Sequence, residues 1–254
     1  MSGECVVRYG PEDRCPVRLF CFPHAGGGAS AFAWWARAGS PGVDLCGIRA
    51  PGRESRIAET PPVRFAGLLD GLETAVAPYT DVPFAFYGQC AGGVVAFELA
   101  RRLRRRGAPL PLALFVSDAA APERAGGEVA ERLADLPTDG LIAALRESGG
   151  TPPAFLDRPD LFELVEDAIR ADLRVLADYR HEPADPLPVP ISALALRGQD
   201  RPSPDEVAGW GRHTSAAFTL RLVDGESFAG TVEREALRSA ITADLERLAS
   251  APAA

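Results

Sequence analysis

One cysteine lies in a sequence context that favours nucleophilic chemistry. Cys90 is the centre of Gly88-Gln-Cys-Ala-Gly92, which directly follows the apolar stretch Phe84–Tyr87. Glycines on both sides of a central residue are typical of a tight strand-to-helix turn, because a Cβ there would collide with the neighbouring element. A helix N-terminus stabilises a thiolate, which is the reactive form of cysteine. The pattern predicts a nucleophile with an enlarged thiolate fraction; a small buried cysteine in an ordinary turn is the alternative.

A glycine run follows the first strong strand pattern. Val17–Phe22 is apolar and ends at Pro23, after which the chain reads His24-Ala-Gly-Gly-Gly28. Such a loop exposes backbone N–H groups, which can stabilise the oxyanion of an acyl-transfer intermediate together with the N–H that follows the nucleophile. A flexible turn is the alternative. The predicted oxyanion and substrate-binding residues are His24, Ala25, Gly26, Gln89 and Ala91.

Acidic residues follow three later strand patterns. Leu112–Ser117 is followed by Asp118, Ile191–Leu196 by Asp200, and Phe218–Val223 by Asp224 and Glu226. The carboxyl ends of parallel strands face one ligand crevice, so we expect Asp118 beside Cys90. Several carboxylates in one pocket cannot all ionise cheaply, which predicts that Asp118, Asp200 and Glu226 take part in proton transfer. Asp200 as a helix cap and Glu226 as a solvent-exposed residue are the alternatives.

The order of these patterns predicts the fold class. Strand patterns alternate with helical ones such as Phe65–Val76, which is typical of an α/β protein with a mostly parallel central sheet. The interval from 122 to 181 has helical periodicity and no strand signal. We therefore expect an α/β-hydrolase core formed by 1–121 and 182–254, with a helical lid formed by 122–181.

Composition narrows the class of protein. The chain has 254 residues and a net charge of −8, which disfavours nonspecific nucleic-acid binding. It has neither an apolar run of the roughly 20 residues that cross a bilayer nor a secretory signal, so we expect a cytoplasmic protein without a membrane partner. Five cysteines without C-x-x-C spacing argue against a disulfide framework and against a metal site.

Several segments together resemble type II thioesterases of polyketide and nonribosomal peptide assembly lines. The matching segments are Phe22-Pro-His-Ala-Gly-Gly27, Pro51-Gly-Arg-Glu54, Tyr87-Gly-Gln-Cys-Ala-Gly92, Gly149-Gly-Thr-Pro-Pro153, Arg170-Ala-Asp-Leu173, and Trp210 with His213-Thr214. The resemblance implies an enzyme without a bound cofactor. Its substrate is an acyl group on the phosphopantetheine arm of an acyl or peptidyl carrier protein, which is the expected partner.

Two positions depart from that family. Its nucleophile is usually serine, where this chain has Cys90, and Glu226 replaces its histidine base, whereas Asp200 stands at the place of its acid. A thiol attacks a thioester without a strong base. Hydrolysis of the acyl-enzyme, however, needs a general base to activate water, and without the histidine it loses that base's rate contribution of typically 10²–10⁴-fold. We therefore expect release by transfer, cyclisation or slow hydrolysis. Thioesterase-like aminoacyl shuttles and Dieckmann cyclases resemble this arrangement, the latter with an acid at the place of Asp118.

Two other functions fit the same residues. A noncatalytic assembly-line component would have lost the triad, and a small-molecule cyclase or lyase would use Asp118 and Glu226 as acid and base without an acyl-enzyme. For docking of an acidic carrier protein, the sequence offers arginines near the predicted pocket: Arg53, Arg56, Arg146, Arg170 and Arg174.

Overall fold

A single seven-stranded sheet organises the described part of the chain. The computed structural model describes residues 4–10, 16–39, 41–148, 153–197, 202–225 and 230–249. The strands are β1 (Val6–Arg8), β2 (Val17–Phe22), β3 (Val43–Ile48), β4 (Phe84–Gln89), β5 (Leu114–Ser117), β6 (Ile191–Leu196) and β7 (Phe218–Val223), in the order β1-β3-β2-β4-β5-β6-β7. The edge strand β1 runs antiparallel to β3, and all other neighbours are parallel. The predicted α/β-hydrolase fold class is confirmed.

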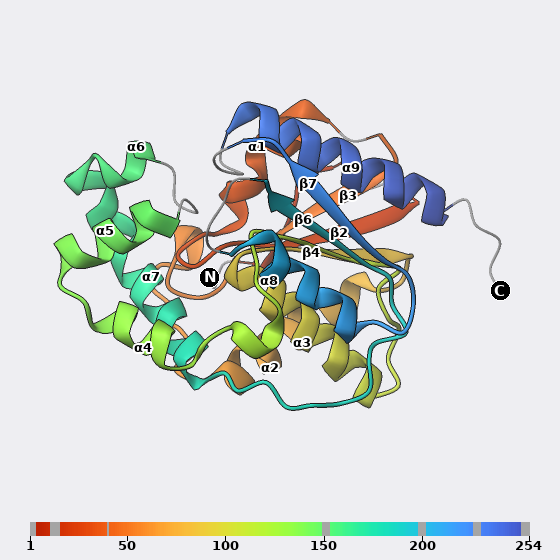
Figure 1. Cartoon of the computed structure of the whole chain (residues 1–254), viewed down its shortest axis with the longest axis horizontal. Helices are drawn as coiled ribbons and strands as arrows, with labels where there is room; N and C mark the ends of the chain where they lie inside the picture. The colour runs from red at the N-terminus through yellow and green to blue at the C-terminus, as the bar shows by residue number, and fades with distance from the viewer. Residues whose placement is uncertain are drawn as a thin grey trace.

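Helices cover both faces of the sheet (Figure 1). On one face lie α1 (Ala33–Ala38) and α9 (Thr231–Ala249), and on the other lie α2 (Phe65–Val76) and α3 (Ala91–Arg105). Strand β4 shows why the sheet needs both layers. Phe84 and Phe86 pack in the core of α2 and α3, whereas Ala85 and Tyr87 pack in the core of α1 and α9. Alternate side chains of a strand point to opposite faces, so a strand covered on both sides is apolar throughout.

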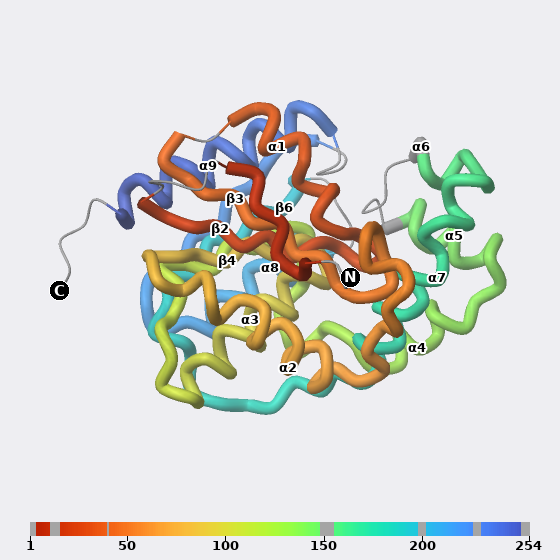
Figure 2. The backbone as a smooth tube through the Cα atoms, turned by 180° about the vertical axis from the view of Figure 1, so that it is seen from behind, coloured from red at the N-terminus to blue at the C-terminus, as the bar shows by residue number. Residues whose placement is uncertain are grey.

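A group of helices lies between β5 and β6. It consists of η4 (Pro122–Arg124), α4 (Gly127–Asp135), α5 (Thr138–Ser148), α6 (Pro153–Leu156) and α7 (Pro159–Asp178). We call residues 122–181 the helical segment; its described residues contain no strand. It has a small core of its own around Leu141 and Phe162. Figures 1 and 2 show it projecting at one end of the sheet, beside the loops that follow β2 and β3.

Short elements complete the fold. They are η1 (Ala29–Phe32), η2 (Glu54–Arg56), η3 (Ala77–Tyr79), α8 (Pro204–Ala208) and η5 (Gly209–His213). The bounds predicted for β2, α2, β6 and β7 agree with the structure, whereas β5 begins at Leu114 and not at Leu112. Within the described ranges, no helix combines the length and the apolar character that crossing a membrane would require.

Candidate active site

The turn between β4 and α3 holds Cys90 in a strained conformation. Cys90 has φ 52° and ψ −120° and is the residue before the first turn of α3. A Cβ on Gly88 would lie 2.3 Å from the carbonyl oxygen of Gly92, and one on Gly92 would lie 2.1 Å from that of Phe22. Both flanking glycines are therefore required by close backbone approach. This is the geometry of a nucleophile elbow.

The environment of Cys90 disfavours its thiolate. Burial, with a smaller contribution from the negative charge of Asp118, raises the pKa of the Cys90 thiol from 9.0 to about 12. A hydrogen bond from the Ala91 N–H acts in the opposite direction. The expectation that the helix N-terminus enlarges the thiolate fraction is therefore wrong. Loss of hydration and the charge of Asp118 outweigh the hydrogen bond from the Ala91 N–H at this position.

Asp118 lies beside Cys90, as the strand order predicts. Gln89 pairs with Ser117 across β4 and β5, and the Cys90 N–H donates to the Ser117 carbonyl at 2.9 Å. Asp118 has φ 53° and is 7% exposed. Its charge reaches the thiol, since it contributes to the shift of the Cys90 pKa. The other two predicted acids, Asp200 and Glu226, lie outside the described residues.

The glycine loop after β2 contributes fewer free N–H groups than its sequence suggests. The Gly26 N–H donates to the Asp172 carboxylate at 2.7 Å, and the Gly27 N–H donates to the His24 carbonyl at 2.9 Å. Gly26 is therefore not an available oxyanion donor. The Ala25 N–H has no hydrogen-bond partner among the described residues, and the Ala91 N–H already points to the Cys90 sulfur. Ala25 and Ala91 are the best pair of donors.

A buried ion pair fixes this loop to α7. Arg53 donates to both oxygens of Asp172, at 2.6 and 2.7 Å, and to the carbonyl of Gly27 at 2.8 Å. The side chain of Ile169 lies so close to Gly26 that a Cβ on this glycine would be 2.2 Å from it. We call Arg53, Asp172 and the loop atoms they bind the clamp. Arg53 is 6% exposed, so the prediction that it docks a carrier protein is wrong.

No contact among the described residues places any of the three histidines at Cys90. Burial lowers the pKa of His24, although a hydrogen bond with Gln89 opposes this, and its Nδ1 is buried without a partner. His213 binds Glu123 at 2.7 Å and packs against the rings of His181 and Phe97. Phe97 lies seven residues along α3 from Cys90, or about 10 Å at 1.5 Å per residue.

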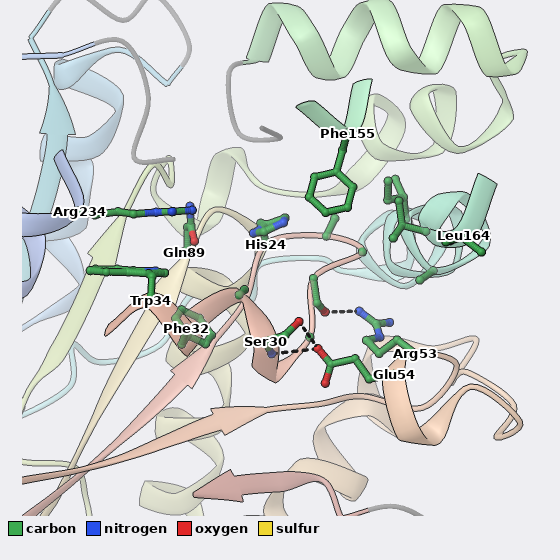
Figure 3. Close-up of a pocket in the computed structure, with 18 of the residues that line it drawn as sticks. His24, Ser30, Phe32, Trp34, Arg53, Glu54, Gln89, Phe155, Leu164 and Arg234 are labelled. Carbon is green, nitrogen blue, oxygen red and sulfur yellow. Dashed lines mark hydrogen bonds between the residues drawn. The ribbon is translucent and has the colours of Figure 1, made fainter. Parts of the chain in front are cut away.

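Two cavities lie on either side of the elbow. The larger has a volume of about 370 Å³, with Gln89 in its wall, and the smaller has about 50 Å³, with Ala91 in its wall. Cys90 lies between these two wall residues in the sequence. The larger cavity is roofed by side chains of the helical segment, of which Figure 3 shows Phe155 and Leu164 opposite His24. Its volume is within the range of small-ligand sites.

Several wall residues of the larger cavity were not predicted as site residues. Trp34 of α1 and Arg234 of α9 face it from the side of Gln89, whereas Ser30 and Glu54 lie on the opposite side (Figure 3). Glu54 has φ 49° and accepts hydrogen bonds from the N–H and hydroxyl groups of Ser30. Neither α1 nor α9 carries a motif that would have indicated a ligand.

Comparison with known proteins agrees with this geometry. The model of the thioesterase domain family matches residues 17–245. The chain belongs to the thioesterase family. Thioesterase PikA5 of Streptomyces venezuelae is 36% identical over 228 residues, which cover 89% of this chain and 80% of that protein. Gramicidin S biosynthesis protein GrsT of Aneurinibacillus migulanus is 32% identical over 212 residues, which cover 84% of this chain and 82% of that protein.

Solved structures extend the match to the whole fold. The type II thioesterase BorB from the borrelidin biosynthetic cluster superimposes with a TM-score of 0.84 at 32% identity, covering 98% of this chain and 99% of that one. The resemblance of this thioesterase to the type II class is thereby confirmed, together with its α/β-hydrolase fold. The use of Cys90 as its nucleophile remains a prediction.

Proposed function

We propose that this thioesterase acts in a polyketide or nonribosomal peptide assembly line and takes acyl groups from a carrier protein onto Cys90. The observation that carries the proposal is the position of Cys90 at the apex of the strained turn between β4 and α3, with the Ala91 N–H at its sulfur. A thiol in this place attacks the carbonyl carbon of a phosphopantetheine thioester.

The first half-reaction needs an acceptor for the thiol proton. With a pKa of about 12, roughly one Cys90 side chain in 10⁵ is a thiolate at pH 7. The nearby carboxylate of Asp118 accepts the proton as the bond from sulfur to the acyl carbon forms. The N–H groups of Ala25 and Ala91 stabilise the resulting oxyanion. Collapse breaks the bond to the pantetheine sulfur, which leaves with the proton from Asp118.

The second half-reaction decides the product. Hydrolysis requires a base that activates water, and no contact among the described residues places a histidine at Cys90: His213 binds Glu123, and the buried His24 is hydrogen-bonded to Gln89. We expect the acyl group to persist on Cys90 until a thiol, an amine or a carbanion of the acyl chain attacks it, or until slow hydrolysis removes it. In this scheme Asp200 and Glu226 remain predicted participants in proton transfer.

The helical segment is proposed as the lid of this site. It supplies the roof of the larger cavity through Phe155, Leu164 and Ile169, and it holds the oxyanion loop through the clamp. For carrier docking, Arg174 is the best of the predicted arginines. It is exposed and has no ion pair among the described residues, whereas Arg170 is held by Glu166 and by the carbonyl of Ala134.

Intact-protein mass spectrometry after mixing with an acyl-loaded carrier protein tests the proposal. The parent protein should gain the mass of the acyl group, Cys90→Ala should gain none, and Cys90→Ser should be nearly as inactive because a carboxylate is too weak a base to activate its hydroxyl. Rapid hydrolysis of acyl thioesters by the serine variant would contradict the claim that the site lacks a base strong enough to do so. Product formation without an adduct would instead support a cyclase or lyase that uses no acyl-enzyme.

A noncatalytic role is the second candidate, because the raised pKa of Cys90 makes it a poor nucleophile at rest. It predicts carrier binding with neither adduct nor product. Asp118→Asn separates the two cases: the enzyme should lose at least about tenfold in loading rate, since the proton acceptor is gone. A noncatalytic protein would show no loading in either form.

A further inference from the structure

Arg234 is a cation placed in the wall of the larger cavity. Its Nε is buried and has no hydrogen-bond partner. The guanidinium forms no ion pair with any carboxylate of the described residues. Burial, with a contribution from the positive charge of Arg37, lowers its pKa. An arginine in such a place loses hydration without receiving a counter-ion in return.

The surroundings hold the guanidinium in place. Arg234 stacks over the indole of Trp34, with 5.4 Å between the guanidinium carbon and the ring centroid. Figure 3 shows its charged end on the side of the cavity where Gln89 lies. The phenol of Tyr87 is its nearest potential anion, but burial raises the pKa of Tyr87 far above neutrality, so this group stays uncharged.

The helix dipole gives no reason for a cation at this position. Arg234 lies in the first turn of α9, which begins at Thr231, and the positive end of a helix dipole disfavours a cation there. On the opposite wall the charged side chains already have partners, because Asp172 neutralises Arg53 and Ser30 donates hydrogen bonds to Glu54. The only carboxylate among the described wall residues, Glu54, lies across the cavity from Arg234 (Figure 3).

We infer that the larger cavity binds an acyl group that carries a carboxylate at its far end, and that Arg234 is the residue that selects it. This inference rests on the proposed function and names the substrate class of the same site: acyl groups derived from short dicarboxylic acids. The thioester carbon lies at Cys90, the neighbouring Gln89 forms part of the cavity wall, and the terminal carboxylate binds the guanidinium above Trp34. Charge-assisted hydrogen bonds to a desolvated arginine are among the stronger polar contacts.

The phosphodiester of the phosphopantetheine arm is another anion that a guanidinium could bind. It sits at the opposite end of the arm from the thioester, and the carrier protein holds it outside the enzyme. Arg234 lies in the wall that contains Gln89, next to the nucleophile. This position favours the acyl carboxylate, and the two sources are separated by probes with and without the phosphate.

Binding of stable analogues tests the inference without any chemistry. The probes are succinyl and butyryl amides of aminopantetheine, which match in length and differ in the carboxylate. Calorimetry on the Cys90→Ala protein should show that the succinyl probe binds about 10- to 100-fold tighter, and Arg234→Leu should abolish that preference. Arg247→Leu is the matched control, because Arg247 is exposed on the same helix and its partner Asp244 keeps Arg221.

Other outcomes overturn the inference in distinguishable ways. Equal binding of the two probes would refute the selection of a carboxylate, even if Cys90 were loaded normally by carrier proteins. If Arg234→Leu weakened the binding only of probes that carry the phosphate, the guanidinium would bind the phosphopantetheine arm and not the acyl group. The protein could also prefer the succinyl probe strongly and yet never form an adduct on Cys90. That result would support the carboxylate-binding site and refute the proposed acyl transfer. Circular dichroism of both arginine variants checks that each is folded.

Discussion

Two arginines on opposite sides of the larger cavity show how differently one fold treats a cation in a cavity wall. Both terminal nitrogens of the Arg53 guanidinium donate hydrogen bonds to Asp172, and one of them also donates to the Gly27 carbonyl. Arg234 has an aromatic ring beneath it and forms no ion pair with a carboxylate of the described residues, although the Nε of each arginine is buried without a partner. The first arrangement positions the backbone of the oxyanion loop. The second leaves a charge available to a ligand, so a satisfied arginine is part of the architecture and an unsatisfied one is part of the binding site.

The largest expected effect comes from breaking the clamp. Asp172→Asn leaves the Arg53 charge buried without its counter-ion and weakens the acceptor for the Gly26 N–H. We expect a loss of about 3 kcal/mol in the free energy of unfolding, less than the upper end for buried pairs because Asp172 is 22% exposed. Urea titration measures it. The control is Asp160→Asn, which breaks the exposed pair with Arg158 and should cost far less, because solvent screens that pair; equal losses would make the clamp an ordinary surface pair.

The next effect concerns which charge acts on the nucleophile. Because its pKa is about 12, alkylation of Cys90 by iodoacetamide should rise about tenfold per pH unit from pH 7 to pH 10 without a plateau. Asp118→Asn removes a negative charge that disfavours the thiolate, so the rate at fixed pH should rise about three- to tenfold. Arg234→Leu should leave it within twofold, since Arg234 does not contribute to the Cys90 pKa. Peptide mass spectrometry follows the modification, and a plateau below pH 9 would contradict the buried thiol.

The smallest effect has the opposite sign to the first. Arg234→Leu removes an uncompensated charge and keeps apolar contact with Trp34, so the free energy of unfolding should stay level or rise by up to about 1 kcal/mol. Arg53→Leu, its counterpart across the cavity, should lower it as Asp172→Asn does. The same urea titrations measure both variants. A loss above about 1 kcal/mol for Arg234→Leu would mean that this arginine also supports the fold.

Sequence patterns predicted the parts of the site that lie on regular elements. The elbow at Cys90 and the place of Asp118 follow from strand ends, because neighbouring parallel strands deliver their carboxyl ends to one edge. Charge environment was harder to predict. The helix N-terminus suggested an enlarged thiolate fraction at Cys90, whereas burial and Asp118 raise its pKa. A local rule for the dipole contains no information about how much water the fold removes.

Contacts between the helical segment and the core could not be predicted either. Arg53 and Asp172 are 119 residues apart, and each lies in a segment that carries the family resemblance. Periodicity shows which face of a helix is apolar but not which loop meets it. Arg234 has no sequence signal at all, because an arginine in the first turns of an amphipathic helix is usually solvent-exposed. Its role became visible only through its position over Trp34.

In the described part of the chain, the three non-glycine residues with left-handed backbones all lie after strands at the same rim: Glu54 after β3, Cys90 after β4 and Asp118 after β5. Each such conformation costs on the order of 1–2 kcal/mol in an L-residue, and glycine would relieve it. Selection of random variants for heat resistance alone would therefore favour glycine at these positions. Such substitutions would remove side chains of the candidate active site. Thermal robustness and catalytic competence compete at these three positions, so a library screened for both properties should leave them unchanged and find its stabilising substitutions elsewhere.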